Sequence, residues 1–354
     1  MNRFRAWLDR LDRRPPNMVR LMLAFMAAGY AASLLVSREL GALAGEAVGT
    51  SPSSMALRWM GGNQAGETLN GDWFRLLTAI FLHGSLLHIL CNTLCTLNVG
   101  PIVVRLYDEW RFLTVWILTG FAASIASGLW QAGGAAGDLL LLPGSVGASG
   151  SGFGILFFLF GALRHASDPG SLAVRRQIVF WTLINVVVGM QLNVDHAGHA
   201  GGALMGYVLS VVMDRTRFRR FHRILNGSRL PQVLFLILIL AFGSVAWNWF
   251  GPKGQNFRRN LAMREIVFEV LNTPNIHSAR DMYSHAREAG ELENRGFEEA
   301  RDFRLYFEML GVLMEGSTPD PMPPHDPDLP SRVLEKAAKI NEGLGVFGFV
   351  MRAR

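Results

Sequence analysis

Apolar residues along this chain are gathered into blocks of about 20 residues, with short polar segments between them. An α-helix of that length crosses a hydrocarbon core of roughly 30 Å. The second block is longer than a span requires, so its first turns are expected at the membrane interface. The pattern predicts an all-α polytopic membrane protein with seven spans, at residues 21–36, 76–104, 112–130, 149–163, 178–192, 197–213 and 233–250.

The segments outside these blocks divide the chain further. From residue 251 onward the chain is polar and charged, and residues 260–271 and 279–313 carry apolar side chains at helical spacing. The expected organisation is therefore a basic cytoplasmic arm (1–17), a six-helix core (18–214), a basic cytoplasmic linker (215–229), a seventh transmembrane helix (230–250) and a polar, largely helical, non-cytoplasmic extension (251–354).

Composition agrees with a membrane protein. Half of the 354 residues are hydrophobic and 18% are charged, whereas about a quarter are charged in an average soluble domain. The net charge of +6 comes from Lys and Arg at the ends of the apolar blocks. When successive spans alternate in direction, the basic clusters fall on one face of the membrane, which predicts a cytoplasmic N-terminus. We therefore expect lipid, and not nucleic acid, around the chain.

The two cysteines, Cys91 and Cys95, lie within one apolar block at helical spacing. That position favours packing residues over a disulfide or a metal pair. We expect neither a metal nor any other cofactor.

Polar residues inside spans are costly, so each one is a candidate for function. The run FLHGSLLHILCN contains His83, His88 and Asn92. His88 and Asn92 are four residues apart and share one helix face, from which both could donate hydrogen bonds into a cavity. A hydrogen bond between helices that only supports packing is the alternative reading.

The run GSVGASGSGFG places Ser149 where a glycine-rich loop becomes a helix. The first turn of a helix offers unpaired backbone N–H groups and a partial positive charge, and such groups can stabilise an oxyanion. Glycines surround the serine on both sides, at 147, 150, 152 and 154. A glycine and serine packing seam is the alternative.

The run VDHAGHAGGALMG carries His199 above a stripe of small residues that includes Gly202 and Gly206. A helix with such a stripe can closely approach the glycine stripe that follows Ser149. Both spans begin on the non-cytoplasmic side, so the serine and the histidine are expected at matching depth. Asp195 and His196 are interpreted as polar residues at the membrane surface, with a triad role for Asp195 as the less favoured alternative.

A serine hydroxyl becomes a good nucleophile when a neighbouring base removes its proton, and neutral histidine suits this task. Ser149 and His199 are therefore the predicted nucleophile and base. A carboxylate is not required if the helices hold the imidazole in place.

Together these motifs resemble the rhomboid family of intramembrane serine proteases, over residues 74–213. The family's H-x-x-x-x-H-x-x-x-N, G-x-S-G and A-H-x-x-G-x-x-x-G motifs correspond to His83, His88 and Asn92; to Gly147, Ser149 and Gly150; and to His199, Gly202 and Gly206. Its Trp-Arg pair reads Trp73-Phe74-Arg75, so the arginine fits and the aromatic residue differs, and Gly198 replaces the alanine before the histidine.

The resemblance implies a six-helix core, here with an extra C-terminal helix, in a bacterial cytoplasmic membrane. It implies a Ser149–His199 dyad and an oxyanion hole formed by the Ser149 N–H with His88 and Asn92. His83, Arg75, Gly147, Gly150, Gly202 and Gly206 would support the site. Substrates would be transmembrane segments of other proteins, cleaved near the outer face through an acyl-enzyme.

Two other functions are compatible with a polytopic chain. An inactive rhomboid-like protein would bind membrane clients without cutting them, but such relatives typically lack the serine or the histidine. A transporter with glycine-broken helices would show inverted repeats and charges near the bilayer centre, and neither is apparent in the sequence.

Overall fold

The structure, a computed structural model, describes residues 16–43, 49–134, 144–189, 194–213, 229–263, 266–267, 270, 279–315 and 328–344. In these ranges the regular elements are helices, and the one β-type pairing is an antiparallel bridge between Asn63 and Ser145. The predicted all-α class is confirmed. The chain forms two compact units, Met1–Arg38 with Val48–Trp247, and Glu39–Ala47 with Asn248–Arg354.

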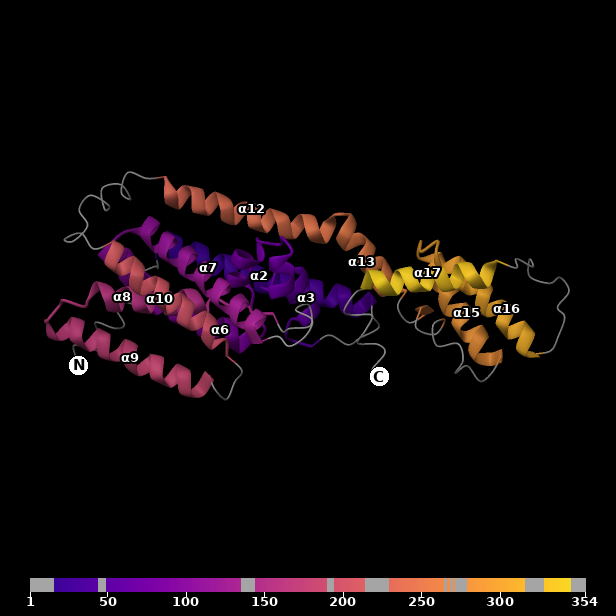
Figure 1. The fold of residues 1–354 in the computed structure, drawn as a ribbon, viewed down its shortest axis with the longest axis horizontal. Coiled ribbons are helices and arrows are strands. Elements are labelled where there is room, and N and C mark those ends of the chain that lie inside the picture. Colours follow the sequence, from indigo (N-terminus) through magenta and orange to yellow (C-terminus); the bar gives the residue numbers. More distant parts are fainter. Residues whose placement is uncertain are drawn as a thin grey trace. The chain divides into compact units, whose positions relative to one another are not determined.

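The first unit holds the elements predicted to cross the membrane (Figure 1). The elements of this unit are α2 (Asn17–Leu43), α3 (Ser54–Trp59), α4 (Ala65–Leu69), α5 (Arg75–Thr78), the 3₁₀ turn η1 (Ala79–Phe81), α6 (Leu86–Leu106), α7 (Glu109–Gly134), α8 (Ser149–Ala162), α9 (Pro169–Gly189), α10 (His196–Val212) and α12 (Leu230–Phe250). The short helices α3 and α4 lie in the loop between the first two predicted spans.

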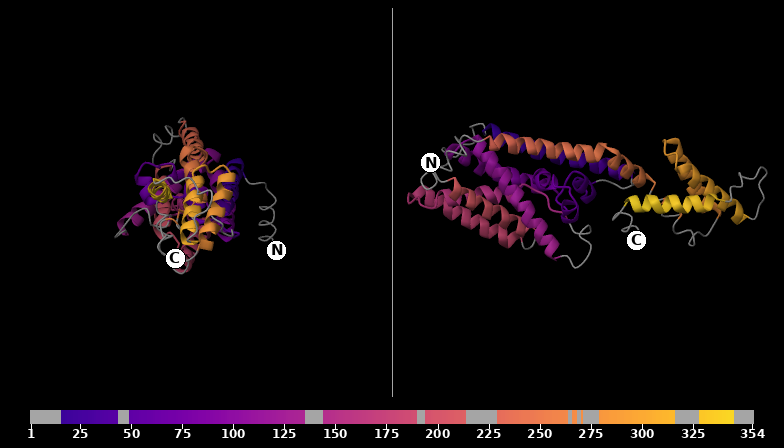
Figure 2. Two further views of the ribbon diagram at one scale, coloured as in Figure 1. Left: turned by 90° about the vertical axis from the view of Figure 1, so that its right-hand side faces the viewer. Right: turned by 45° about the horizontal axis from the view of Figure 1, so that its top comes forward.

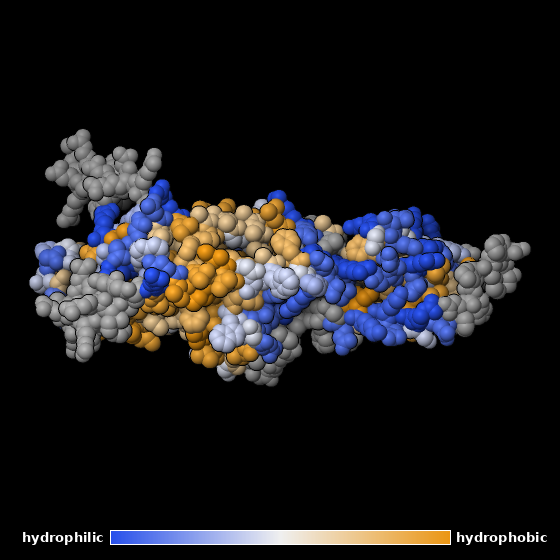
Figure 3. Space-filling model, turned by 90° about the horizontal axis from the view of Figure 1, so that it is seen from above, coloured by the Kyte–Doolittle hydropathy of each residue, from blue (hydrophilic) through white to orange (hydrophobic). Residues whose placement is uncertain are grey.

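Four of these helices, α2, α6, α7 and α12, are long and apolar enough to cross a membrane, and α8 is a shorter apolar helix. The helices α9 and α10 lie where the fifth and sixth spans were predicted. In Figure 3 hydrophobic residues gather on the face where α12 lies, and α12 exposes Leu236, Leu240 and Trp247. Apolar side chains exposed along a helix are typical of contact with lipid.

The second predicted span, 76–104, is not one continuous helix. It is divided into α5, η1, a four-residue connection and α6. Ser85 ends the connection, and its Oγ accepts a hydrogen bond from the His88 N–H at 3.2 Å. This is an N-cap, which satisfies a donor that would otherwise be unpaired at the start of α6. The break lets His83 approach the site from a loop.

The core of the first unit combines aliphatic residues with several large aromatic side chains. Its largest fully buried side chains include Trp116, Phe112, Phe158 and Phe81. The helix α8 packs along α10 and α7, and these helices lie side by side in Figures 1 and 2.

The seventh predicted helix, α12, packs on the first unit through a cluster of phenylalanines. Phe242 stacks on Phe25 of α2 with ring centroids 5.5 Å apart, and it lies 5.5 Å from Phe81 of η1. Phe25 and Phe81 also pack edge to face. These contacts fasten α12 to the turn that precedes α6.

We expect Phe242→Ala to destabilise the protein, because it removes two aromatic pairs that each contribute about 0.5–1.5 kcal/mol. The loss of unfolding free energy in detergent micelles should be about 1–3 kcal/mol. Leu240→Ala, at an exposed site on the same helix, is the matched control. Equal losses in both variants would contradict a specific role for the cluster.

The loop before α6 is organised around Arg75, which is buried. Its guanidinium bonds to Glu67 at 2.7 Å and to Asp72 at 3.0 Å, and it donates to the carbonyl oxygens of Arg58 and Gly62. These partners compensate a charge that would otherwise be costly to bury. The guanidinium also lies 5.3 Å from the centre of the Phe74 ring, whereas Trp73 is 71% exposed.

The second unit contains α13 (Pro252–Ala262), α15 (Ala279–Asn294), α16 (Ala300–Glu315) and α17 (Leu329–Leu344). The helical stretch predicted at 279–313 is two helices. The chain turns at Gly296, whose φ of +93° favours glycine. Helices α15 and α16 bury Met282, Phe303 and Phe307 between them and their neighbours.

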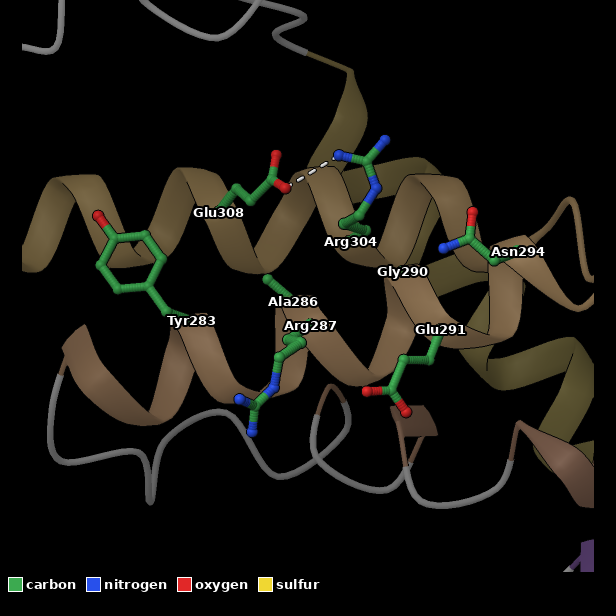
Figure 4. Close-up of a pocket in the computed structure, with 8 residues that line it drawn as sticks. All are labelled: Tyr283, Ala286, Arg287, Gly290, Glu291, Asn294, Arg304 and Glu308. Atoms are coloured by element: carbon green, nitrogen blue, oxygen red, sulfur yellow. Dashed lines mark hydrogen bonds and ion pairs between the residues drawn. The ribbon is translucent and has the colours of Figure 1, made fainter.

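An open groove follows the α15–α16 pair (Figure 4). Within it Arg304 bonds to Glu308 at 2.9 Å, and it also bonds to Glu293. The groove is lined by Tyr283, Ala286, Arg287, Gly290, Glu291, Asn294, Arg304 and Glu308. Most of the basic arm, the basic linker up to residue 228 and most of the Pro-rich segment lie outside the described residues.

Candidate active site

The predicted nucleophile and base lie together. Ser149 is the first residue of α8, and His199 lies in the first turn of α10. The Ser149 Oγ and the His199 Nε2 are 2.8 Å apart, which is hydrogen-bond distance. This is the arrangement in which an imidazole can take the hydroxyl proton.

The close approach of α8 and α10 depends on glycine. A Cβ added to Gly202 would overlap the carbonyl oxygen of Gly150, and one added to Gly206 would overlap that of Gly154. Gly150 itself lies against the Cβ of Ala123 in α7. The predicted contact between the two glycine stripes is confirmed, and it sets the distance between the serine and the histidine.

We expect Gly202→Ala to separate α10 from α8, because the new methyl group meets backbone that has no room to move. A displacement of about 1 Å at reacting groups can cost about 100-fold in rate, so the rate at which a fluorophosphonate labels Ser149 should fall by that factor. Gly243→Ala, where a Cβ meets nothing within 4 Å, is the control. An unchanged labelling rate in Gly202→Ala would mean that the helix spacing does not control the site.

The imidazole of His199 is held by a neighbour that the sequence analysis missed. Phe153, one turn after Ser149 on α8, stacks on the ring with centroids 4.3 Å apart and planes at 19°. His196 packs edge-on against the same ring at 6.5 Å. The four-residue spacing from Ser149 placed Phe153 on the same helix face, and this was the available signal.

Asp195 has a structural role in α10. It is the N-cap, and its Oδ1 accepts the Gly198 N–H at 2.8 Å. A Cβ on Gly198 would come within 2.6 Å of the Asp195 Oδ2. The capping carboxylate therefore has room in this position because residue 198 is glycine. The carboxylate is thus used at the helix terminus, and a third catalytic member is not needed to explain its position.

The predicted oxyanion donors converge beside Gly147. This residue has a φ of +127°, and its N–H donates to the Ala79 carbonyl oxygen at 2.9 Å. A Cβ there would lie 2.6 Å from His88 Nε2 and 3.7 Å from Asn92 Nδ2. Because Gly147 has no side chain, the space beside these two nitrogens stays open. Gly147 lies two residues before Ser149.

Asn92 is buried, and its Nδ2 has no hydrogen-bond partner among the described residues. A buried donor without a partner is unfavourable unless a ligand or water uses it. His83 is also fully buried, and its ring packs edge-on against His88 at 5.0 Å. This ring contact with His83 supports the position of His88.

Among the described residues, no group of three or more His, Cys, Asp or Glu side chains could hold a metal ion. Both cysteines are free thiols. Cys95 lies beside Gly152, whereas Cys91 is exposed, so the packing role predicted for Cys91 is wrong.

Comparison with known proteins finds relatives of this chain. The chain is similar to "Rhomboid protease GluP" of Bacillus subtilis (30% identity, 58% of this chain, 38% of the relative). It is also similar to "Rhomboid protease AarA" of Providencia stuartii (28%, 41% and 57%) and to "RHOMBOID-like protein 4" of Arabidopsis thaliana (32%, 46% and 40%). The chain thus spans less than two thirds of the length of each of these relatives.

A family model described as Rhomboid domain matches residues 70–216. This stretch contains Arg75, the two helices that carry Ser149 and His199, and the oxyanion candidates His88 and Asn92. Residues 70–216 are thus a Rhomboid domain, and the chain that carries it is an integral membrane protein.

Proposed function

We propose that the protein is an intramembrane serine endopeptidase that cleaves transmembrane segments of other membrane proteins. The observation that carries the proposal is the 2.8 Å contact between Ser149 Oγ and His199 Nε2, held by the glycine contacts of α8 and α10. The names of two bacterial relatives, each a "Rhomboid protease", support the same reaction class.

In this mechanism the His199 Nε2 accepts the Ser149 proton as Oγ attacks the substrate carbonyl carbon. Negative charge develops on the carbonyl oxygen. The Ser149 N–H, His88 and Asn92 donate to it. The imidazolium then protonates the leaving amine, and an acyl-enzyme on Ser149 remains. Water, deprotonated by His199, attacks the ester, and the imidazolium returns the proton to the Ser149 Oγ as the second product leaves. Stacking on Phe153 keeps the imidazole in line throughout.

The site is proposed to open to the non-cytoplasmic face, near the outer end of the substrate helix. Exposed tryptophans at 73, 130 and 247 lie near the ends of predicted spans, as expected for residues at a membrane interface. When the spans alternate in direction, Arg105, Arg111, Arg164 and Arg175 fall on the side opposite to the site. The position of the arginines supports a cytoplasmic N-terminus and a non-cytoplasmic extension from residue 251, and we propose a bacterial inner membrane because two relatives are bacterial.

The test is cleavage of a model transmembrane substrate by the purified protein in liposomes, together with labelling by a fluorophosphonate. We expect cleavage, and an adduct that mass spectrometry locates on Ser149. His199→Ala should remove both, while its thermal unfolding stays cooperative. Stable binding of the substrate by an unlabelled, non-cleaving wild type would refute the proposal and favour the inactive, client-binding alternative.

A further inference from the structure

Asn63 joins the first loop to the chain segment that leads into Ser149. It follows Gly61 and Gly62 and is fully buried. Its backbone forms an antiparallel bridge with Ser145, in which each N–H donates to the other residue's carbonyl oxygen at 3.0 Å. Glycine makes this pairing close, because a Cβ on Gly62 would lie 3.2 Å from the Val146 side chain.

The side chain of Asn63 joins a third element. Its Nδ2 donates to the Ser124 carbonyl oxygen of α7 at 2.8 Å and contacts the Ser145 Oγ at 3.3 Å. Its Oδ1 accepts from the Thr68 hydroxyl at 3.1 Å. Both kinds of polar atom in the amide are therefore used. A buried residue with bonds to three separate segments resists displacement of any one of them.

The segment that Asn63 holds, residues 144–147, forms one wall of the site. Ser145 lies four residues before Ser149. Gly147, between them, is bound to the Ala79 carbonyl oxygen and faces His88 and Asn92. The segment is thus attached at Ser145 and again at Gly147, and the helix that presents Ser149 begins directly afterwards. A shift at Ser145 is transmitted to the backbone around the nucleophile.

We propose that Asn63 is a positioning residue for the proteolysis proposed above, on which this role rests. It aligns residues 144–147, so that the Ser149 N–H keeps its place opposite the amide of Asn92 and the imidazole of His88. It makes no contact with the Ser149 or His199 side chains, and it acts through the backbone of residues 144–147.

Asn63→Asp separates this role from a general effect on folding. Aspartate keeps the shape and the acceptor for Thr68, but it loses both N–H donors and places an oxygen against the Ser124 carbonyl. The matched control is Thr78→Val. Thr78 is also fully buried near the first loop, and its hydroxyl donates to the Gly61 carbonyl oxygen at 2.7 Å, but it does not bond to residues 144–147.

Three quantities are measured for each variant in liposomes: kcat and KM for a transmembrane substrate, the fluorophosphonate labelling rate, and Tm. For Asn63→Asp we expect kcat and the labelling rate to fall by roughly 30- to 100-fold, with KM within about threefold of wild type. Thr78→Val should lower Tm by a similar amount and keep both rates within about threefold. Equal rate losses in the two variants, or unchanged rates in Asn63→Asp, would overturn the proposal.

Ser145→Ala keeps the proposal testable if Asn63→Asp does not fold. It removes one partner of the Asn63 amide and leaves the bond to Ser124 intact, so we expect the labelling rate to fall by about fivefold. An unchanged labelling rate would contradict the positioning role of Asn63. A wild-type protein that is neither labelled nor active would refute the proteolysis itself. If instead the wild type is active and Asn63→Asp is equally active, only the role of Asn63 is refuted.

Discussion

Replacement of Ser149 by alanine is expected to lower kcat for peptide-bond cleavage by about 10⁶-fold, the loss seen when the nucleophile of a serine protease is removed. The His199 Nε2 lies within hydrogen-bond distance of the Ser149 Oγ. Without that oxygen there is no nucleophile, and His199 has no hydroxyl proton to accept. Cleavage of a reconstituted transmembrane substrate, followed by gel and mass spectrometry, measures the loss.

The neighbouring serine provides the control for this experiment. Ser151 is buried, and its Oγ donates to the Trp116 carbonyl oxygen at 2.9 Å, so Ser151→Ala should retain cleavage. Fluorophosphonate labelling that persists in Ser149→Ala would place the nucleophile elsewhere and remove the basis of the proposed mechanism.

Replacement of Asn92 by alanine is expected to lower kcat by about 100- to 1,000-fold, with little change in KM, as when one oxyanion donor is lost in a soluble protease. The Asn92 Nδ2 is buried beside Gly147 with no partner among the described residues. Such a donor has most to gain when negative charge appears next to it. The selective loss of kcat follows because the charge exists only in the transition state and the tetrahedral intermediate.

Asn98→Ala is the matched control on the same helix. Asn98 is exposed, and its Nδ2 donates to the Leu94 carbonyl oxygen at 2.7 Å, so its loss should leave kcat unchanged. If His88 and Asn92 serve one oxyanion, the double variant should lose less than the product of the two single losses. Wild-type kcat in Asn92→Ala would assign this asparagine to packing alone.

In the proposed site the imidazole of His199 is oriented by its ring neighbours, and Asp195 has another role. Asp195, the one acidic residue near His199 in sequence, caps its own helix through Gly198. The orientation of the imidazole is instead supplied by the face of Phe153 and the edge of His196. An apolar stacking partner fixes the ring without adding a charge inside the membrane, where charges are costly.

Several features could be predicted from local patterns. Block length and hydropathy located some apolar helices to within a few residues, for example α8, which was predicted at 149–163 and observed at Ser149–Ala162, whereas α9 begins nine residues before the predicted position 178. The small-residue stripe below His199 predicted a close helix contact, and the contacts of Gly202 and Gly206 confirm it. Periodicity could not reveal the breaks at Ser85 and Gly296, because caps and left-handed turns interrupt a pattern without changing its composition.

By itself the sequence determined the all-α membrane class, the order of the apolar helices and the residue types able to carry serine protease chemistry. These follow from hydropathy and from spacing along one helix, which are local properties. Only the tertiary structure decided that Ser149 meets His199, that Phe153 stacks on the imidazole, and that Asn63 binds Ser124 and Ser145. These contacts join residues that are 46 to 82 positions apart in the sequence. The packing of the helices decides which of their faces meet. The contacts depend on how closely neighbouring backbones can approach, which no single helix specifies.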